Sequence, residues 1–424
     1  MKKYFNKIKN SGLLLIDQGL VSGTSFITGI MLTRFLGLKE YGAFILLWMV
    51  ILFGLSITQA LITQPLVSLE PKMSQEESNP YLRSVHGFQL LLSLLATLLS
   101  IIALTLLSQF EFFRSLELLT ITGLSLALGL ILLYDFYRKY FFLKNDFKTP
   151  LGTDAILMII QLGGIFLLYE TGLLSIPYFL SVVAFTYLVV CGIGYIKILR
   201  PEFGTKALTT VFQKHYDFSK WLLGTVALQW LGGNFFIICA GGILGAATVG
   251  AVRIAQNVIG LTHVIFLAME NVVPISAARA FKDGGRKKLY TFLKNISLKI
   301  GWFVMSILIL ISIFSPNILG LLYGEDFVAY SYILICFCII YLLVYIGYPL
   351  RFALRTLELT KPIFIAYALG AIFSVIMAAP MLQYWGIYGL LLGLFMTQLI
   401  TQSVYVISLW KIKRYYENHS FDTR

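Results

Sequence analysis

A row of polar residues inside an otherwise apolar stretch, residues 247–275, is the first candidate for chemistry. The spacing alternates between three and four residues, which predicts one face of a helix about 30 Å long. Charged groups within a membrane span cost roughly 2.5–3.5 kcal/mol on insertion scales, so each needs a reason. The row would either line a water-filled, ligand-binding cavity, with Asn257 beside it, or form a polar seam between helices. Its members are Arg253, Gln256, Gly260, His263, Leu267, Glu270 and Pro274.

A second polar face lies within residues 11–34. Asp17, Thr24 and Thr28 are spaced for one side of a helix, and Arg34 follows at its end. The two threonines would line a cavity, or simply allow close packing, because small residues also let two helices approach. Asp17 is a candidate proton or ion site; the alternative is an interfacial partner for the N-terminal lysines.

Further polar residues stand alone in other apolar stretches. Asp154 either pairs with Arg138 or Lys148 near the inner surface, or joins Asp17 and Glu270 as a candidate group for ion coupling. The weaker candidates for substrate binding are Gln59, Gln229 and Asn234.

Composition defines the class of protein that must position these residues. Hydrophobic residues make up 58% of the 424 and charged residues 12%, and the mean hydropathy is +0.83. A soluble domain is about one-quarter charged, so this is a polytopic membrane protein. Long apolar runs without barrel-like alternation predict helices. At about 20 residues a span, we predict an all-α fold with twelve spans: 11–34, 41–68, 83–108, 115–137, 150–169, 173–196, 217–242, 247–275, 289–314, 327–350, 362–383 and 386–410.

Lysine and arginine orient these spans, because cytoplasmic loops carry the excess of both. With the N-terminus cytoplasmic, 28 of the 33 lie in inner segments, and only five do not. The pattern therefore predicts both termini in the cytoplasm. The net charge of +13 follows from this topology, so nucleic acid is not a predicted partner. The five exceptions are Arg34, Lys39 and Arg114 outside, and Arg253 and Lys299 within spans.

The chain also repeats itself. Gly37 and Gly42 align with Gly245 and Gly250, and further matches follow at slowly increasing offsets as far as Gly172 with Gly386. The repeat predicts two homologous six-helix bundles, residues 1–200 and 217–424, joined by a cytoplasmic linker at 201–216. Copies with the same orientation form a substrate site near the midplane between them in many transporters, which is what we expect here.

Signatures of enzymes are missing from the sequence. It contains no Walker A motif, no cluster with metal-ligand spacing and no nucleophile elbow. A membrane polymerase or glycosyltransferase would carry catalytic residues in a sizeable outer loop, and the predicted outer loops are short. We therefore predict a protein that is not an enzyme and needs no cofactor or metal.

Two segments and the overall plan resemble the Wzx-type polysaccharide flippases. The segments are TRFLGLKEYGAF at residues 33–44 and YRKYFFLKNDFKTPLGTDA at residues 137–155, and the plan is the pair of six-helix lobes. These flippases belong to the superfamily that also contains the MATE drug exporters and the lipid II flippases. The resemblance implies a MATE-like central cavity that opens alternately to either side of the bacterial cytoplasmic (inner) membrane.

The resemblance also implies a substrate and partners. The substrate would be an undecaprenyl-diphosphate-linked oligosaccharide, moved from the inner to the outer leaflet for O-antigen, capsule or exopolysaccharide assembly. Some members couple this movement to an H⁺ or Na⁺ gradient, and a polysaccharide polymerase and a chain-length regulator are implied partners. Arg253 best fits a role at the diphosphate, with Arg34 second; because few cations lie in the membrane, a neutral or modestly charged glycan is favoured.

One alternative remains a MATE-like, cation-coupled exporter of small amphipathic molecules. Such an exporter would use carboxylates in its cavity to bind cationic drugs, whereas the polar row at 247–275 offers Arg253 instead.

Overall fold

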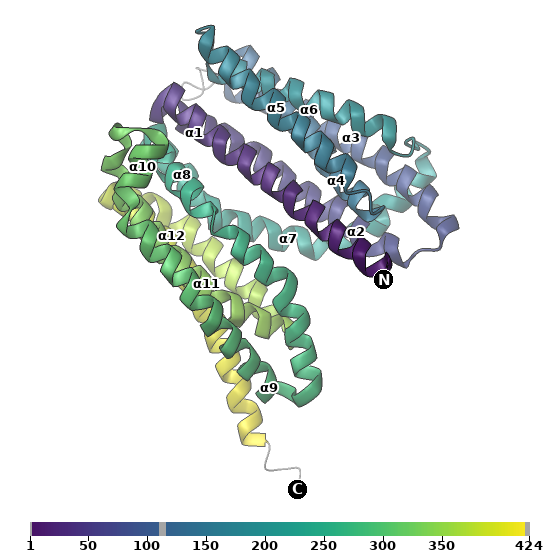
Figure 1. Ribbon diagram of the computed structural model, residues 1–424, viewed down its shortest axis with the longest axis vertical. Coiled ribbons are helices and arrows are strands. Elements are labelled where there is room, and N and C mark those ends of the chain that lie inside the picture. The colour runs from purple at the N-terminus through teal and green to yellow at the C-terminus, as the bar shows by residue number, and fades with distance from the viewer. Residues whose placement is uncertain (1, 110–115, 420–424) are drawn as a thin grey trace. The chain divides into compact units, whose positions relative to one another are not determined.

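A computed structural model describes residues 2–109 and 116–419 of the chain, and these residues contain helices and no strands (Figure 1). The predicted all-α membrane fold is therefore confirmed. Nine stretches of the described residues are long and apolar enough to cross a membrane. The elements are α1 (Lys2–Thr58), η1 (Gln59–Thr63), α2 (Gln64–Leu69), η2 (Glu70–Lys72), α3 (Gln75–Leu107), α4 (Leu118–Leu143), α5 (Lys148–Glu170), α6 (Ile176–Lys197), α7 (Thr205–Ile243), α8 (Ala246–Gly260), α9 (His263–Ile313), α10 (Ser315–Tyr323), η4 (Glu325–Tyr330), α11 (Ser331–Thr356) and α12 (Lys361–His419).

Glycines divide the three longest helices. Helix α1 breaks at Gly37, α9 at Gly284 and Gly285, and α12 at Gly386. The breaks in α1 and α12 each separate two predicted spans that lie within one apolar stretch. The break in α9 separates the predicted span 289–314 from the second half of the span 247–275, whose first half is the short helix α8 and lies outside the nine stretches. The backbone at Gly37 has φ 80° and ψ 172°, a region open essentially to glycine alone.

Backbone conformation follows the sequence repeat. Gly37 and its counterpart Gly245 both have positive φ, 80° and 91°, and Gly172 and Gly386 have 69° and 53°. The described residues include two non-glycine residues with positive φ, Asn145 at 58° and Glu358 at 59°. These two lie at matching points of the two copies, since each follows the helix that forms the fourth predicted span of its half, α4 in one and α11 in the other. Turn geometry therefore repeats where the sequence repeats.

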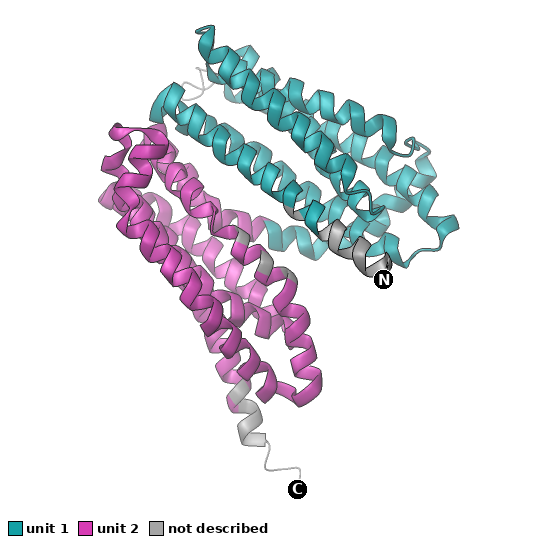
Figure 2. Cartoon of the chain, in the orientation of Figure 1, with its two compact units in different colours: residues 1–226 teal, residues 227–424 magenta. Residues whose placement is uncertain are grey.

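The chain forms two compact units, Met1–Val226 and Ala227–Arg424 (Figure 2). Their division lies inside α7, which begins at Thr205, so most of the segment predicted as a linker at 201–216 is helical. In unit 1, α4 packs against α3 and α6. Its buried side chains join a core whose members include Leu66, Leu82, Phe136, Tyr137 and Val190. In unit 2, α11 packs against α8, α9 and α12.

Candidate functional site

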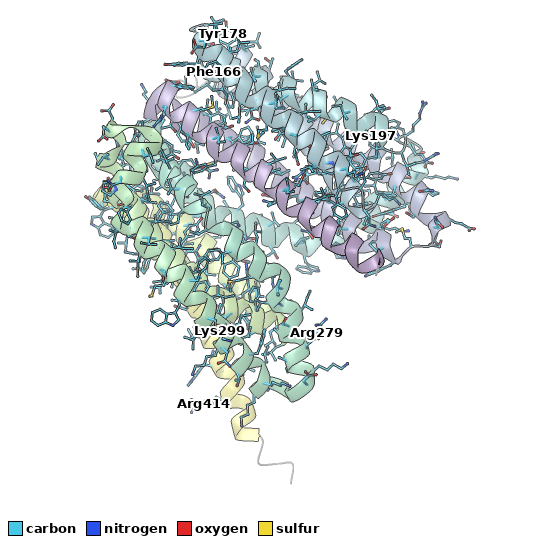
Figure 3. All side chains as sticks on the ribbon, in the orientation of Figure 1. Phe166, Tyr178, Lys197, Arg279, Lys299 and Arg414 are labelled. Atoms are coloured by element: carbon cyan, nitrogen blue, oxygen red, sulfur yellow. The ribbon has the colours of Figure 1, made fainter. Side chains whose placement is uncertain are left out.

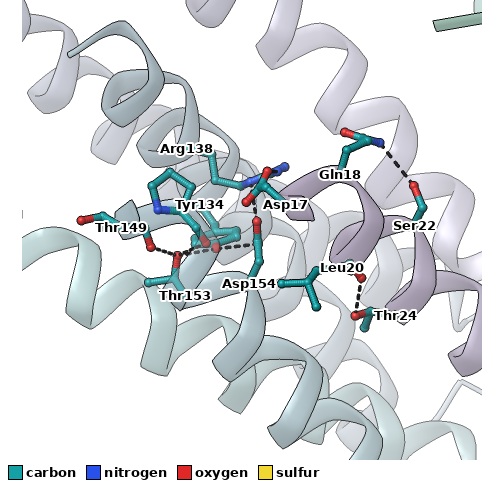
Figure 4. A network of polar contacts seen from close by, with 11 residues as sticks. Asp17, Gln18, Leu20, Ser22, Thr24, Tyr134, Arg138, Thr149, Thr153 and Asp154 are labelled. Carbon is teal, nitrogen blue, oxygen red and sulfur yellow. Dashed lines mark hydrogen bonds and ion pairs between the residues drawn. The ribbon is translucent and has the colours of Figure 1, made fainter. Parts of the chain in front are cut away.

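A buried ionic network lies in unit 1, where α1, α4 and α5 meet (Figure 4). Arg138 Nη2 lies 2.6 Å from Asp17 Oδ2, and Arg138 Nε lies 3.1 Å from Asp154 Oδ2. The hydroxyl of Tyr134 donates to Asp154 Oδ1 at 2.7 Å. Both carboxylate side chains are 3% exposed and that of Arg138 is 18% exposed. One guanidinium thus serves two buried carboxylates.

Helical spacing brings these groups together. Tyr134 and Arg138 are four residues apart on α4, so they occupy one face and both reach α5. Thr153 donates to the carbonyl of Thr149 within α5 and lies 2.7 Å from the Tyr134 hydroxyl. The expected pairing of Asp154 with Arg138 is confirmed. Asp17 also pairs with Arg138; the side chains of the N-terminal lysines, its predicted partners, lie outside the described residues.

Sequence reasoning missed the central role of α4. The predicted span ended at residue 137 and assigned Arg138 to a cytoplasmic loop, but α4 continues to Leu143. Asp135 on the same helix accepts a hydrogen bond from Gln59 Nε2 at 3.3 Å. Gln59 begins η1, a short π-helix of the kind that often marks functional sites. The signal was available, because residues 134–138 contain a tyrosine, an aspartate and an arginine at helical spacing.

Unit 2 contains a smaller polar group on α8. Arg253 is half-buried and its Nη1 lies 3.4 Å from Gln256 Oε1. The next residue, Asn257, donates from Nδ2 to the hydroxyl of Tyr323 at 3.1 Å. Arg253 also interacts electrostatically with Tyr341 on α11. Three of the predicted substrate-binding residues therefore lie together on one short helix.

The continuous polar face predicted for residues 247–275 is wrong. Helix α8 ends at Gly260, a turn follows, and α9 begins at His263. His263 is exposed and its ring contacts that of Phe266 edge-on. Glu270 forms an ion pair with Arg351 of α11, and this guanidinium also lies 4.7 Å from the centre of the Tyr348 ring. The interruption detaches His263 and Glu270 from the group around Arg253.

The two ion-paired arginines occupy equivalent places in the repeat. Arg138 and Arg351 each lie seven residues before a positive-φ residue, Asn145 and Glu358 respectively. Like Arg138, Arg351 was assigned to a cytoplasmic loop and lies instead within a helix, α11. Each unit therefore has an arginine–carboxylate ion pair near the end of the helix that forms its fourth predicted span, buried in unit 1 and partly exposed at Glu270 in unit 2.

The remaining predicted residues make local contacts. Thr28 accepts a hydrogen bond from Gln161 Nε2 at 2.9 Å, which joins α1 to α5. Thr24 and Asn234 donate to backbone carbonyls of their own helices, as polar side chains often do within helices. The side chains of Gln229 and Arg34 are exposed. The side chain of Lys299, one of the two basic residues predicted to lie within spans, is also exposed (Figure 3).

The described residues hold no group of three or more histidine, cysteine, aspartate or glutamate side chains able to bind a metal ion. Unit 1 holds two carboxylates on one arginine, and unit 2 holds Arg253 beside neutral amide and hydroxyl groups.

Comparison with solved structures shows the fold. The chain is similar to an inward-facing multidrug resistance MATE family transporter of the MOP superfamily, with a TM-score of 0.78 and 12% identity over 93% of this chain and 95% of that one. It is also similar to the lipid II flippase MurJ in an inward closed conformation, with a TM-score of 0.72 and 15% identity over 95% and 87%. A MOP superfamily transporter from Pyrococcus furiosus, described as having a binding pocket of reverse polarity, gives a TM-score of 0.59 and 13% identity over 96% and 95%.

A comparison with curated protein sequences gave no match. The profile of one family, described as "Polysaccharide biosynthesis protein", matches residues 31–332. This range includes all of α4, α5 and α8, which carry most of the polar groups described above. The chain is a multi-pass membrane protein and belongs to the polysaccharide biosynthesis protein family.

Proposed function

We propose that this protein is a flippase for undecaprenyl-diphosphate-linked oligosaccharides. It would move repeat units from the inner to the outer leaflet of a bacterial cytoplasmic membrane by alternating access, with both termini in the cytoplasm. Membership of the polysaccharide biosynthesis family and likeness in fold to a lipid II flippase support a lipid-linked sugar as substrate. A diphosphate head group needs such a carrier because unpaired charge is costly in hydrocarbon.

The observation that carries this proposal is the difference between Arg253 and two other arginines within helices. Arg138 and Arg351 are each paired with carboxylates. Among the described residues Arg253 has no carboxylate within ion-pair distance, and its hydrogen-bond partner is the neutral amide of Gln256. An arginine without a counter-ion favours an anionic ligand, and a guanidinium can bind phosphate oxygens through two parallel hydrogen bonds.

The groups around Arg253 suit the sugar part of the same ligand. Gln256, Asn257 and Tyr323 supply amide and hydroxyl groups, which both donate and accept hydrogen bonds. Their neutrality favours a neutral or modestly charged repeat unit, since nothing here would balance several negative charges on the glycan.

Asp17, Arg138 and Asp154 are the proposed coupling site. Two carboxylates and one guanidinium carry a net charge of −1, and buried net charge is unfavourable. Binding of one H⁺ or Na⁺ would balance it and weaken the hold of Arg138 on one aspartate. Asp135 and Lys139 lie next to Arg138 on α4 and contribute opposite charges of their own. Movement of α1 relative to α4 and α5 would then depend on the cation gradient.

The alternative, an exporter of cationic amphipathic molecules, is less well supported. Its binding carboxylates would have to be available to a drug, whereas Asp17, Asp154 and Glu270 are each paired with arginine. Arg253 would repel such a substrate.

The test replaces Arg253 in the native host. Arg253→Ala should abolish surface glycan and cause lipid-linked oligosaccharide to accumulate, with the protein still present in the membrane. Arg253→Lys should retain part of the export, because it keeps the charge and loses the bidentate geometry. The matched control is Arg279→Ala, an exposed arginine of unit 2 labelled in Figure 3. Normal surface glycan in Arg253→Ala would contradict the assignment.

A further inference from the structure

A groove of about 660 Å³ lies within unit 2, between the second half of α9 and α11. Tyr290, Lys294 and Ser297 line one end of it, and mostly apolar side chains line the rest. Of these, Leu298 and Trp302 are 55% and 72% exposed. A membrane protein exposes apolar side chains to lipid in any case, so the apolar part alone identifies no partner.

The polar end of the groove contains two buried hydroxyl groups that lack hydrogen bonds. Tyr290 Oη and Ser297 Oγ are buried and have no hydrogen-bond partner among the described residues. Lys294 lies between them in sequence, is exposed, and forms none of the ion pairs found in the described part of the chain. Buried hydroxyl groups are nearly always hydrogen-bonded, so this end of the groove indicates an occupant with polar groups of its own.

The internal repeat identifies the equivalent surface in unit 1. Tyr290 of α9 matches Tyr81 of α3 at an offset of 209 residues, and Arg351 of α11 matches Arg138 of α4 at an offset of 213. Helices α9 and α11 pack together, as α3 and α4 do. The groove of unit 2 therefore corresponds to the surface that α3 and α4 form in unit 1.

In unit 1 the first part of α7 lies on this surface. The Tyr81 hydroxyl is 2.8 Å from His215 Nε2. The ring of Phe88, seven residues further along α3, contacts the rings of Phe212 and His215 edge-on. A helix thus supplies to Tyr81 the hydrogen-bond partner that its counterpart Tyr290 lacks.

This part of α7 is strongly amphipathic. Val211, His215 and Ser219 are buried at a spacing of four, and every residue between them is exposed. His215 Nδ1 lies 2.9 Å from the carbonyl of Leu61, which can only accept, so Nδ1 donates and Nε2 accepts the Tyr81 hydroxyl proton. The surface of unit 1 therefore binds one face of a helix, and that face contains a hydrogen-bond acceptor.

The equivalent turns of the two units differ in charge. Residues 70–83 contain three glutamates, one lysine and one arginine, and residues 205–220 of α7 contain three lysines and one aspartate. In unit 2 the matching residues 279–292 contain five basic residues and one aspartate, and Lys294 follows. The helix that complements unit 1 is basic, whereas the groove of unit 2 is complementary to an acidic one.

We propose that the groove of unit 2 binds an amphipathic helix of a partner membrane protein, and that the polar face of this helix is acidic. The helix takes the place that the first part of α7 has in unit 1. Its apolar face packs into the groove, a polar group of that face accepts from the Tyr290 hydroxyl, and its carboxylates lie near Lys294. The topology predicted from sequence puts this end at the cytoplasmic face. The proposal goes beyond the proposed function and does not depend on the transported substrate.

The experiment uses a fluorescent peptide of residues 205–220 in which the three lysines are replaced by glutamate. Its binding to the full-length protein in detergent is measured by fluorescence anisotropy, and the unmodified peptide is the control. The acidic peptide should bind more tightly. Lys294→Glu should weaken its binding about fivefold, the effect of an exposed charge pair of about 1 kcal/mol. Lys299→Glu should not, because Lys299 is an exposed lysine of the same helix that does not line the groove (Figure 3).

A second pair of substitutions tests the hydrogen bond. Tyr290→Phe removes a hydroxyl without a partner, so the thermal midpoint of the protein should not fall. It should weaken binding of the acidic peptide about fivefold, and His215→Phe in the peptide should weaken it equally. Both substitutions together should have no more effect than either alone, since each removes the same bond.

Four results would overturn the proposal. The first is that the acidic peptide does not bind, and the second is that Lys294→Glu and Lys299→Glu have equal effects. The third is a dimer of the purified protein that Lys294→Glu dissociates, which would assign the groove to a second copy of this chain. The fourth is displacement of the peptide by dipalmitoyl phosphatidylglycerol but not by dipalmitoyl phosphatidylcholine, which would assign the groove to an anionic phospholipid.

Discussion

Asp17 of α1 and Asp154 of α5 share a single counter-ion, with Arg138 of α4 at 2.6 Å from one and 3.1 Å from the other. The guanidinium of Arg138 therefore links the three helices, and both carboxylates depend on it for a compensating positive charge. Removing the arginine would leave two buried negative charges close to each other, with the hydroxyl of Tyr134 bonded to one of them.

Arg138→Met should consequently destabilise the protein strongly. Breaking a buried pair by removal of one partner costs about 3–5 kcal/mol, because an uncompensated charge remains. The measurement is thermal unfolding of the detergent-purified protein, compared with Arg83→Met, an exposed arginine of α3. The triple variant Asp17→Asn, Arg138→Met, Asp154→Asn should recover most of the loss. A midpoint for Arg138→Met equal to that of Arg83→Met would show that the network contributes nothing to stability.

Much of the fold was predictable because hydropathy and glycine act locally. A stretch of 20 apolar residues must be helical in lipid wherever it packs, and a glycine such as Gly37 or Gly386 marks a bend whose φ other residues avoid. The same reasoning found the repeat, whose matched turns recur in the backbone.

The ionic network around Arg138 was harder to predict from the sequence, for a physical reason. Counting lysine and arginine as loop markers assumes that membrane charges are unpaired, whereas a paired arginine can lie within a helix near its end. Its partners, Asp17 and Asp154, lie 121 and 16 residues away in sequence, so only tertiary packing brings them together. The break after Gly260 was missed because the polar spacing continues through a turn that is not helical.

Asp146 gives a prediction for acid stability outside the membrane-spanning helices. It lies before α5 and accepts hydrogen bonds from the backbone amides of Lys148 and Thr149 and from the Thr149 hydroxyl. Partial burial raises the pKa of the Asp146 carboxyl group, but these hydrogen bonds outweigh it and hold the pKa below its ordinary value of 3.8. A lowered pKa means that the stabilisation is complete above pH 3.8 and is lost as the pH falls through the folded-state pKa.

Asp146→Ala should therefore lower the thermal midpoint at pH 7, at a cost of about 1 kcal/mol as for other lost helix caps. The difference from the unmodified protein should shrink only below pH 3.8. Asp217→Ala is the control, since the Asp217 side chain is 73% exposed and forms an exposed ion pair with Lys220. Equal thermal midpoints of Asp146→Ala and the unmodified protein at pH 5 would contradict the role of Asp146 as a cap of α5.

Substitution by alanine should change the thermal stability of the protein in opposite directions at Gly37 and Gly163, because the backbone conformation differs between these two positions. A Cβ at either position meets no heavy atom within 4 Å. Steric clashes with neighbouring side chains therefore do not contribute to the difference between the two variants. Gly37 has φ 80° and ψ 172°, where an alanine costs about 1–3 kcal/mol. Gly163 lies inside α5, where alanine is favoured over glycine by roughly 0.5–1 kcal/mol. Thermal unfolding of the two purified variants should thus give a lower midpoint for Gly37→Ala and an equal or higher one for Gly163→Ala. Equal midpoints would mean that α1 can continue through residue 37 without the bend.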